Sequence, residues 1–224
     1  MAFFITFEGV EGCGKTTQLK RLKERIEEAG ERVTATREPG GSPVADKIRA
    51  ILLDAENRDM VPLAELLLYA AARAQHVQEV IAPALERGDI VLCDRFTDAT
   101  MAYQGYGREL NLETIGQLNE LATGGLQPQL TVLIDCPVEV GLTRALARIE
   151  STTGAREERF ELESVRFHER VRDGYLRLAA TYPDRFVVVD GSGSVEQTEV
   201  VLVSAIASRL PDKLRAAFGG GRVR

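Results

Sequence analysis

Short apolar runs alternate with longer amphipathic segments along this chain of 224 residues. Most of the runs are continuous rather than alternating, which is typical of parallel strands that are buried on both faces. They comprise Phe3–Phe7, Arg32–Thr36, Ile90–Asp94, Leu130–Asp135 and Phe186–Asp190. Because segments with helical periodicity separate them, the order predicts successive βαβ units. We therefore expect an α/β fold with a five-stranded parallel sheet and helices on both faces.

Directly after the first strand, residues Gly9–Thr16 match the pattern GxxxxGK[ST], and a helix is expected to follow. In this context the pattern is typical of the phosphate loop of P-loop NTPases, whose backbone N–H groups face phosphate oxygens. We expect Lys15 to contact the β- and γ-phosphates of ATP and the Thr16 hydroxyl to bind Mg²⁺. Further ATP contacts are expected from Gly9, Val10, Glu11, Gly12, Cys13, Gly14 and Thr17.

A second group of polar residues follows the second and third strands. Asp94 ends the third strand and precedes Arg95, and Arg37 follows the second strand. Ligands of open α/β sheets bind outside the carboxyl ends of the strands, so we expect these side chains beside the phosphate loop. Asp94 suits the Mg²⁺ shell, and two arginines favour an acceptor that carries its own phosphate. The sequence thus favours a kinase for a nucleoside monophosphate.

Composition and charge narrow the partners. The chain has 34 acidic and 28 basic residues, and a formal charge of −6 makes nucleic acid a poor partner. Cys13, Cys93 and Cys136 form no CxxC pair and no Cys/His cluster, so neither zinc nor a disulfide framework is expected. No apolar segment approaches the roughly 20 residues that span a bilayer. We expect a cytoplasmic protein with no membrane partner.

Four motifs together resemble the thymidylate kinase family in its bacterial style. They are Gly9–Thr17, Arg37-Glu38-Pro39-Gly40-Gly41, Asp94-Arg95-Phe96 and Ala102-Tyr103-Gln104-Gly105, in order over most of the chain. The second and fourth are fairly specific among P-loop kinases. The resemblance implies transfer of the γ-phosphate of ATP to thymidine 5′-monophosphate (dTMP), with Mg²⁺, to give dTDP for DNA synthesis. It also implies a homodimer.

The resemblance assigns further residues of the acceptor site. Arg37 and Arg95 match positions that hold the thymidylate phosphate. Tyr69 and Arg73, on a helix expected from Leu63 to Glu86, match positions that stack on thymine and bond its carbonyl. Tyr103 and Gln104 match positions that line the sugar and the base, and Glu11 matches a carboxylate directed at the sugar and the phosphate. Thr100 lies where a small hydroxyl residue is common. The Tyr103 ring is expected to crowd the 2′ position and so to favour deoxyribose.

The remaining catalytic charge is expected from a lid over about residues 149–161. Some family members carry an arginine directly after the carboxylate of the phosphate loop, where this chain has Gly12. The transition state still needs positive charge, so we expect Arg159 to close over the γ-phosphate. Arg148 matches the arginine that stacks on adenine. The expected catalytic set is Lys15, Asp94, Arg95 and Arg159.

We expect one domain over residues 1–212, which includes the lid, and a flexible tail over residues 213–224. Two other functions stay open. A kinase for another monophosphate, such as uridylate, is compatible with Tyr69 and Arg73, because uracil lacks only the methyl group of thymine. A non-catalytic nucleotide-binding switch is disfavoured by the retained Lys15, Thr16 and Asp94.

Overall fold

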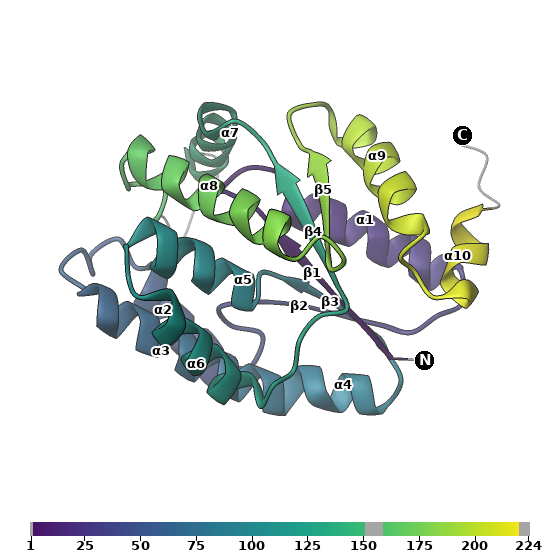
Figure 1. The fold of residues 1–224 in the computed structure, drawn as a ribbon, viewed down its shortest axis with the longest axis horizontal. Coiled ribbons are helices and arrows are strands. Elements are labelled where there is room, and N and C mark those ends of the chain that lie inside the picture. Colours follow the sequence, from purple (N-terminus) through teal and green to yellow (C-terminus); the bar gives the residue numbers. More distant parts are fainter. Residues whose placement is uncertain (1, 151–158, 220–224) are drawn as a thin grey trace.

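The computed structural model of the protein describes residues 2–150 and 159–219. Its five strands form one parallel sheet in the order β2-β3-β1-β4-β5 (Figure 1). The strands are β1 (Phe3–Glu8), β2 (Val33–Arg37), β3 (Ile90–Asp94), β4 (Leu130–Asp135) and β5 (Phe186–Asp190). Each strand lies within one residue of its predicted bounds, so the predicted α/β fold is confirmed.

Two helical layers cover the sheet. The first contains α1 (Lys15–Glu28), α9 (Val195–Ala207) and α10 (Asp212–Gly219), which Figure 1 shows together beside β5. The second contains α3 (Pro62–His76), α4 (Ala82–Glu86), α5 (Thr97–Thr100), α6 (Leu112–Thr123), α8 (Val165–Thr181) and the π-helical turns η1 (Val77–Ile81) and η2 (Met101–Gly107). Helices α2 (Pro43–Leu53) and α7 (Val138–Glu150) lie near the carboxyl ends of the strands.

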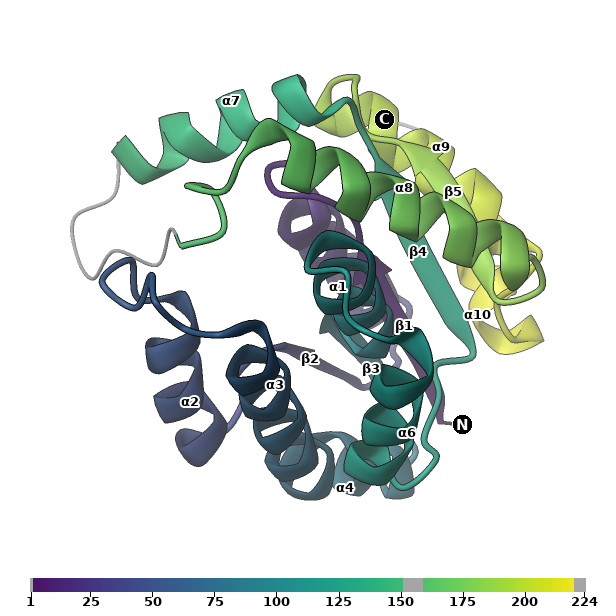
Figure 2. The same ribbon diagram turned by 60° about the vertical axis from the view of Figure 1, so that its left-hand side comes forward.

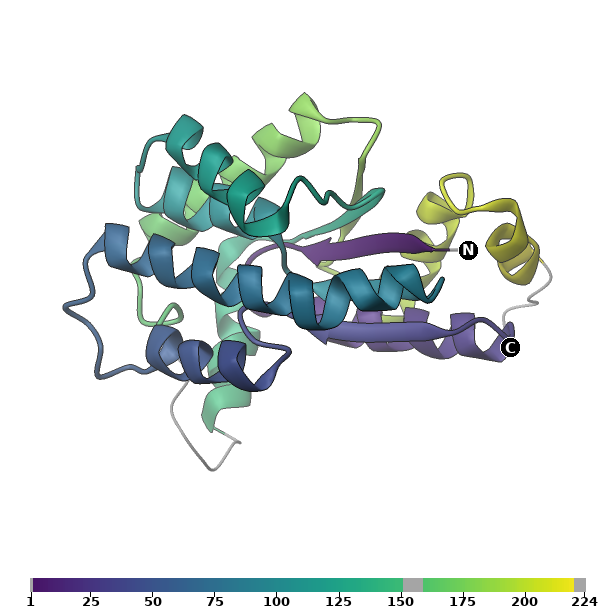
Figure 3. The same ribbon diagram turned by 90° about the horizontal axis from the view of Figure 1, so that it is seen from below.

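Helices α3, η1 and α4 form one continuous run along the sheet, visible as the long blue helix in Figure 3. Pro83 lies inside this run, has no N–H and cannot donate to the preceding turn, and the wider π-helical turn η1 ends two residues before it. The predicted helix from Leu63 to Glu86 is confirmed, with this local change of pitch. Among the described residues, no helix combines the length and the apolar character needed to cross a bilayer.

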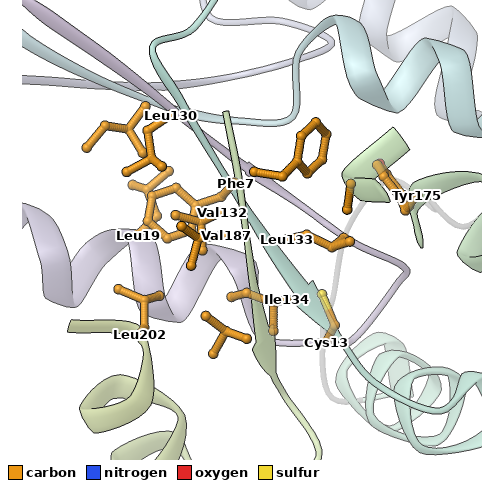
Figure 4. Packing of buried hydrophobic residues seen from close by; sticks show 14 of the residues in the cluster. Phe7, Cys13, Leu19, Leu130, Val132, Leu133, Ile134, Tyr175, Val187 and Leu202 are labelled. Atoms are coloured by element: carbon orange, nitrogen blue, oxygen red, sulfur yellow. The ribbon is translucent and has the colours of Figure 1, made fainter. Parts of the chain in front are cut away.

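Strand β4 illustrates how the core forms, because its side chains alternate between the two faces of the sheet. Figure 4 shows Val132 pointing toward Leu19 and Leu202 of the first layer, and Leu133 pointing toward Tyr175 of α8. All five side chains are buried. Since both faces are covered, the strands have no solvent face that polar residues would occupy. This explains the continuous apolar runs in the sequence.

The folded part of the chain extends beyond the predicted boundary at residue 212. Helix α10 occupies residues 212–219, and Leu210 and Leu214 are buried against the main core. Leu214 of α10 and Leu210, just before this helix, thus anchor it beside α9. Within the predicted tail, only residues 220–224 lie outside the described part of the chain.

The phosphate loop and α7 approach each other very closely at two glycines. A Cβ atom added to Gly12 would overlap the carbonyl oxygen of Gly141, and one added to Gly141 would overlap the carbonyl oxygen of Glu11. Gly12 also has a φ of 65°, a left-handed conformation that glycine adopts without strain. The backbone of α7 therefore fills the space that a side chain at position 12 would need.

We predict that Gly12→Ala lowers the free energy of unfolding by about 2–4 kcal/mol, because strain at positive φ adds to overlap with backbone that cannot rotate away. Gly116→Ala is the matched control. Gly116 lies inside α6 with no atom within 4 Å of its added Cβ, so this change should stabilise the protein by about 0.5–1 kcal/mol. Chemical denaturation measures both values. Equal effects of the two substitutions would contradict the proposed close approach.

Candidate active site

A cavity of about 1210 Å³ opens at the carboxyl ends of β1, β2 and β3. Figure 2 shows α2 and α3 on one side of this end of the sheet and α7 and α8 on the other. Most of the side chains that the sequence analysis assigned to ATP or acceptor binding line the cavity. They are Glu11, Gly12, Lys15, Thr16, Arg37, Tyr69, Arg73, Asp94, Arg95, Thr100, Tyr103, Gln104 and Arg148.

The phosphate loop holds its lysine close to its own backbone. Lys15 is buried, and its Nζ donates to the carbonyl oxygens of Gly9 at 3.1 Å and Val10 at 2.8 Å. The side chains of Val10 and Cys13 turn into the core, so these residues offer only backbone groups to a ligand. Helix α1 begins at Lys15, directly after Gly14. The loop thus presents an ammonium group and a helix N-terminus at the same place, an arrangement that suits phosphate.

Two oxygen atoms of the kind that bind Mg²⁺ lie together where the phosphate loop passes the end of β3. The Thr16 hydroxyl donates to Asp94 Oδ2 at 2.5 Å. The parallel pairing of β1 with β3 brings them together, because Phe7 and Asp94 are partners in the register. The predicted metal residues therefore lie side by side, although 78 positions separate them in the sequence.

Arg95 links the phosphate loop to the acceptor side of the cavity. Its Nη2 donates to Glu11 Oε1 at 3.0 Å, and its Nη1 donates to the carbonyl oxygen of Gly9 at 3.0 Å. The Tyr103 hydroxyl donates to the same Glu11 oxygen at 2.5 Å, and the Arg95 guanidinium lies over the Tyr103 ring, 4.7 Å from its centre. Three predicted acceptor residues from three segments thus form one connected cluster.

The charge of Glu11 depends on its cationic neighbours. Burial by itself would raise the pKa of this carboxyl, but the positive charge of Arg95, together with His168 and Lys15, holds the pKa well below its usual range. His168 Nδ1 lies 3.3 Å from Glu11 Oε2, at ion-pair distance but without hydrogen-bond geometry. Glu11 is therefore an anion at neutral pH. The sequence analysis did not place His168 beside it.

The predicted thymine-binding residues lie on α3. Arg73 is fully buried and donates to Glu38 Oε2 at 2.8 Å and Asn119 Oδ1 at 2.7 Å. It also donates to Thr100 Oγ1 at 3.0 Å, which brings two predicted site residues together. Tyr69, one turn earlier, lines the cavity and lies 6.4 Å from the Phe160 ring, centre to centre. An aromatic ring and a fixed guanidinium therefore occupy the same wall.

Glu38 organises this wall, and the sequence analysis gave it no role. Its second oxygen, Oε1, is 3.0 Å from His76 Nδ1, while His76 Nε2 lies 2.6 Å from the Thr36 hydroxyl. All of these groups except Thr36 are fully or almost fully buried. Because Glu38 belongs to the Arg-Glu-Pro-Gly-Gly motif, the motif itself was the available signal. His76 has a structural place in this network.

Arg37 points to the outer rim of the cavity. Its side chain is 54% exposed, and its Nη2 is 3.2 Å from Asp46 Oδ1 on α2. An exposed ion pair of this kind is weak, so the guanidinium can exchange Asp46 for a ligand anion at low cost. The predicted contact with the acceptor phosphate remains compatible with this position.

Glu65 is a second buried carboxylate that the sequence analysis missed. Gln104 Nε2 donates to its Oε1 at 2.7 Å, and Arg108 Nη2 donates to its Oε2 at 3.1 Å. Arg159 Nη1 lies 2.7 Å from the same Oε2. A lone glutamate in the apolar first turns of α3 was the only sign of this role, and that sign is weak.

The structure does not bring Arg159 to the phosphate loop, where the sequence analysis placed it. Apart from its ion pair with Glu65, it donates from Nε to the carbonyl oxygen of Leu52 at 2.5 Å, and it is buried. Two acceptors in a dry environment hold the guanidinium more firmly than solvent does, which explains this position. Its neighbours Phe160 and Glu161 line the cavity. Residues 151–158 of the predicted lid lie outside the described part of the chain.

Arg148, which the sequence analysis assigned to adenine, lies near the end of α7. It lines the cavity, and its Nη2 is 3.5 Å from Glu161 Oε1. Burial and the nearby charge of Glu11 raise the pKa of Glu161. One turn before Arg148, Arg144 donates to the carbonyl oxygen of Gly191 at 2.8 Å, which joins α7 to the loop after β5. This fixes the direction from which α7 approaches the phosphate loop.

Comparisons with known proteins agree with this geometry. The family model described as thymidylate kinase matches residues 7–200. A thymidylate kinase of Citrifermentans bemidjiense is 73% identical over 210 residues, 94% of this chain and 93% of that protein. That of Geobacter sulfurreducens is 62% identical over 211 residues, 94% of this chain and 99% of that protein.

Solved structures place the fold in the same family. The crystal structure of a thymidylate kinase from Ehrlichia chaffeensis superposes with a TM-score of 0.72 at 33% identity. The match covers 92% of this chain and 98% of that one. Since the family model, the sequence relatives and the solved structure agree over nearly the whole length, the chain belongs to the thymidylate kinase family.

Proposed function

We propose that this chain transfers the γ-phosphate of ATP to dTMP and so forms dTDP and ADP. The observation that carries the proposal is the shared cavity, which unites the phosphate loop with Arg95, Tyr69 and Arg73. A switch that only binds a nucleotide has no use for a second group of anion-binding and aromatic residues at the same sheet edge. The thymidylate kinase relatives favour the same reaction.

The acceptor's parts correspond to different walls of the cavity. We assign the dTMP phosphate to Arg95 and Arg37, and the thymine ring to Tyr69 and Arg73. Tyr103 lies between these groups, where its buried ring limits the room at the sugar. The acceptor phosphate needs no general base, because its second pKa near ~6 leaves it largely dianionic at neutral pH. One of its oxygens attacks the γ-phosphorus, and ADP leaves.

We assign Mg²⁺ to Thr16 and Asp94. A hydroxyl and a carboxylate oxygen within 2.5 Å of each other are the hard donors that Mg²⁺ takes. Mg²⁺ prefers few protein ligands and completes its shell with water and phosphate oxygens, so this small donor set fits. When bound, it neutralises charge on the phosphate oxygens. The protein's own part is to hold Lys15 and the loop amides around the same phosphates.

We propose that Arg159 contacts the γ-phosphate after it leaves Glu65 when ATP binds. This exchange is favourable because a triphosphate carries more negative charge than one carboxylate. Arg159 Nη2 has no hydrogen-bond partner among the described residues although it is buried. A buried guanidinium that lacks a partner loses stabilisation, which lowers the cost of changing partners.

We further propose a cytoplasmic homodimer. The three cysteines are buried and unpaired, which suits a reducing compartment. Large apolar side chains are exposed on α2, α3 and α6, three helices that pack side by side. They are Val44, Ile51, Leu63, Leu67 and Leu121. Exposed apolar side chains on three adjacent helices favour a second copy of the same chain as a partner.

We predict an order of preference among three acceptor nucleotides. Production of ADP with dTMP should exceed that with deoxyuridine monophosphate by about 10–200-fold in kcat/KM, because the methyl group fills an apolar pocket. Uridylate should be poorer still, since its 2′-hydroxyl meets Tyr103. A coupled ADP assay with all three acceptors checks this order. Equal rates with the two deoxynucleotides would remove the thymine assignment and keep the kinase.

Arg159→Ala should lower kcat by about 10²–10³-fold, because a charge on the transferring phosphoryl group is lost. The Kd of dTMP should not change. Arg166→Ala, an exposed position on α8, is the matched control and should keep full activity. Rapid-quench kinetics and equilibrium binding measure the two quantities. If Arg159→Ala lowers the melting temperature but leaves kcat intact, its contact with Glu65 is structural and the catalytic role is wrong.

The dimer prediction rests on Leu67, which is 49% exposed on α3. Leu67→Glu should convert dimers to monomers, because a buried unpaired carboxylate is costly at an apolar interface. Val200→Glu is the matched control, since Val200 is 53% exposed on α9 in the other layer. Sedimentation velocity reports both masses. A wild-type monomer at micromolar concentration would contradict the proposal.

A further inference from the structure

Arg95 reaches the cavity through an unusual backbone conformation. Its φ is 70°, in the left-handed region that non-glycine residues rarely adopt, and its N–H donates to the carbonyl oxygen of Phe7 at 2.9 Å. This bond ties the residue after β3 to the end of β1. Strain of this size persists only where the surroundings hold the residue firmly. We therefore expect the Arg95 side chain to be held by its neighbours as well.

Three acceptors fix the Arg95 guanidinium. Nη1 donates to the Gly9 carbonyl oxygen and to the Tyr175 hydroxyl, both at 3.0 Å, and Nη2 donates to Glu11 Oε1 at 3.0 Å. Within the described part of the chain, Nε makes no hydrogen bond. Nε and the second hydrogen of Nη2 therefore stay available to a ligand oxygen, and Arg95 lines the cavity. Nη1 has the opposite role, since both of its hydrogens are used by the protein.

Tyr175 can accept from Arg95 only because its own hydrogen points elsewhere. The residue is 1% exposed on α8, and its hydroxyl donates to Glu8 Oε2 at 2.8 Å. A phenol has a single O–H, so donation to Glu8 leaves a lone pair facing Arg95. Packing does not require this oxygen, because a phenylalanine ring would fill the same space against Leu133 (Figure 4).

Glu8 sets the direction of this chain of hydrogen bonds. It is fully buried at the end of β1, and its other oxygen, Oε1, accepts from the N–H of Phe96 at 2.8 Å. Burial and the negative charge of Asp98 raise its pKa to about 8, against the opposing effects of Arg95, Tyr175 and the Phe96 amide. A carboxyl group in so unfavourable a place is costly, and Glu8 does not itself line the cavity.

We propose that Glu8 and Tyr175 are positioning residues that aim Arg95 at the phosphate of the acceptor nucleotide. Glu8 accepts the Tyr175 hydrogen, Tyr175 accepts from Nη1, and Nε and the second Nη2 hydrogen are thereby left for a phosphate oxygen. The proposal rests on the phosphate-binding role of Arg95 given under the proposed function. It assigns these residues to recognition of the phosphate and leaves recognition of thymine and deoxyribose to other groups.

Tyr175→Phe tests this proposal, because it removes one hydroxyl and keeps the ring. Calorimetry compares the binding of dTMP with that of thymidine, which has the same base and sugar but no phosphate. We expect about tenfold weaker binding of dTMP, the loss of one charge-assisted hydrogen bond, and unchanged binding of thymidine. The KM of ATP should also stay the same. Tyr182→Phe, an exposed tyrosine that directly follows α8, is the matched control and should change none of these values.

A second variant tests the direction of the hydrogen bonds. Measured near pH 9, where Glu8 with its pKa of about 8 is ionised, Glu8→Gln replaces one acceptor with an NH₂ donor, which cannot accept from both Tyr175 and Phe96, so dTMP should again bind about tenfold more weakly. The double variant should bind dTMP no more weakly than either single one, because both act through the same contact. If the two losses of dTMP affinity multiply in the double variant, the proposed series of hydrogen bonds from Glu8 to Arg95 is contradicted.

Arg95→Ala separates failure of this proposal from failure of its premise. If Arg95→Ala weakens dTMP but not thymidine, while Tyr175→Phe changes neither, the positioning role is wrong and the role of Arg95 stands. If Arg95→Ala also has no selective effect, the premise itself is wrong. If Tyr175→Phe weakens dTMP and thymidine equally, Tyr175 serves the fold alone and the proposal is overturned.

Discussion

The guanidinium of Arg95 joins the two halves of the site. It bonds Gly9 and Glu11 of the phosphate loop and Tyr175 of α8, while its backbone N–H is bonded to β1. A reaction between two anions needs positive charge at the point where they meet. A positive charge that the protein already holds in place stabilises the transition state without a cost of reorganisation. The position of Arg95 therefore depends on the parallel pairing of β1 with β3 and on the docking of α8.

Buried carboxylates hold the other cations of the site in the same manner. Glu38 orients Arg73, Glu65 gathers Gln104, Arg108 and Arg159, and Glu11 receives Arg95. Such pairs contribute little net stability, because desolvation offsets most of the attraction between the charges. The pairs instead fix the orientation of each guanidinium. Only the N–H groups that the carboxylate does not use remain available to a ligand. The cavity can then distinguish ligands by the placement of their oxygens.

The contact between Gly12 and Gly141 excludes a charged side chain from this position of the phosphate loop. With the backbone of α7 so close, no side chain fits at position 12. Arg148, near the end of α7, lines the cavity. Arg159 is held by Glu65 and Leu52, away from the phosphate loop.

Local patterns in the sequence were sufficient to predict the strands, the fold and the phosphate loop. Continuous apolar runs, helical periodicity and Gly9–Thr16 are local signals, since each is encoded within a few residues of the element it describes. The acceptor residues came from motifs of similar length. Contacts between distant segments depend on how the layers pack, such as Glu8 with Tyr175, 167 positions apart, and Arg159 with Leu52, 107 apart. A buried charge is placed by whichever partners the packed layers bring to it, and no local pattern records those partners.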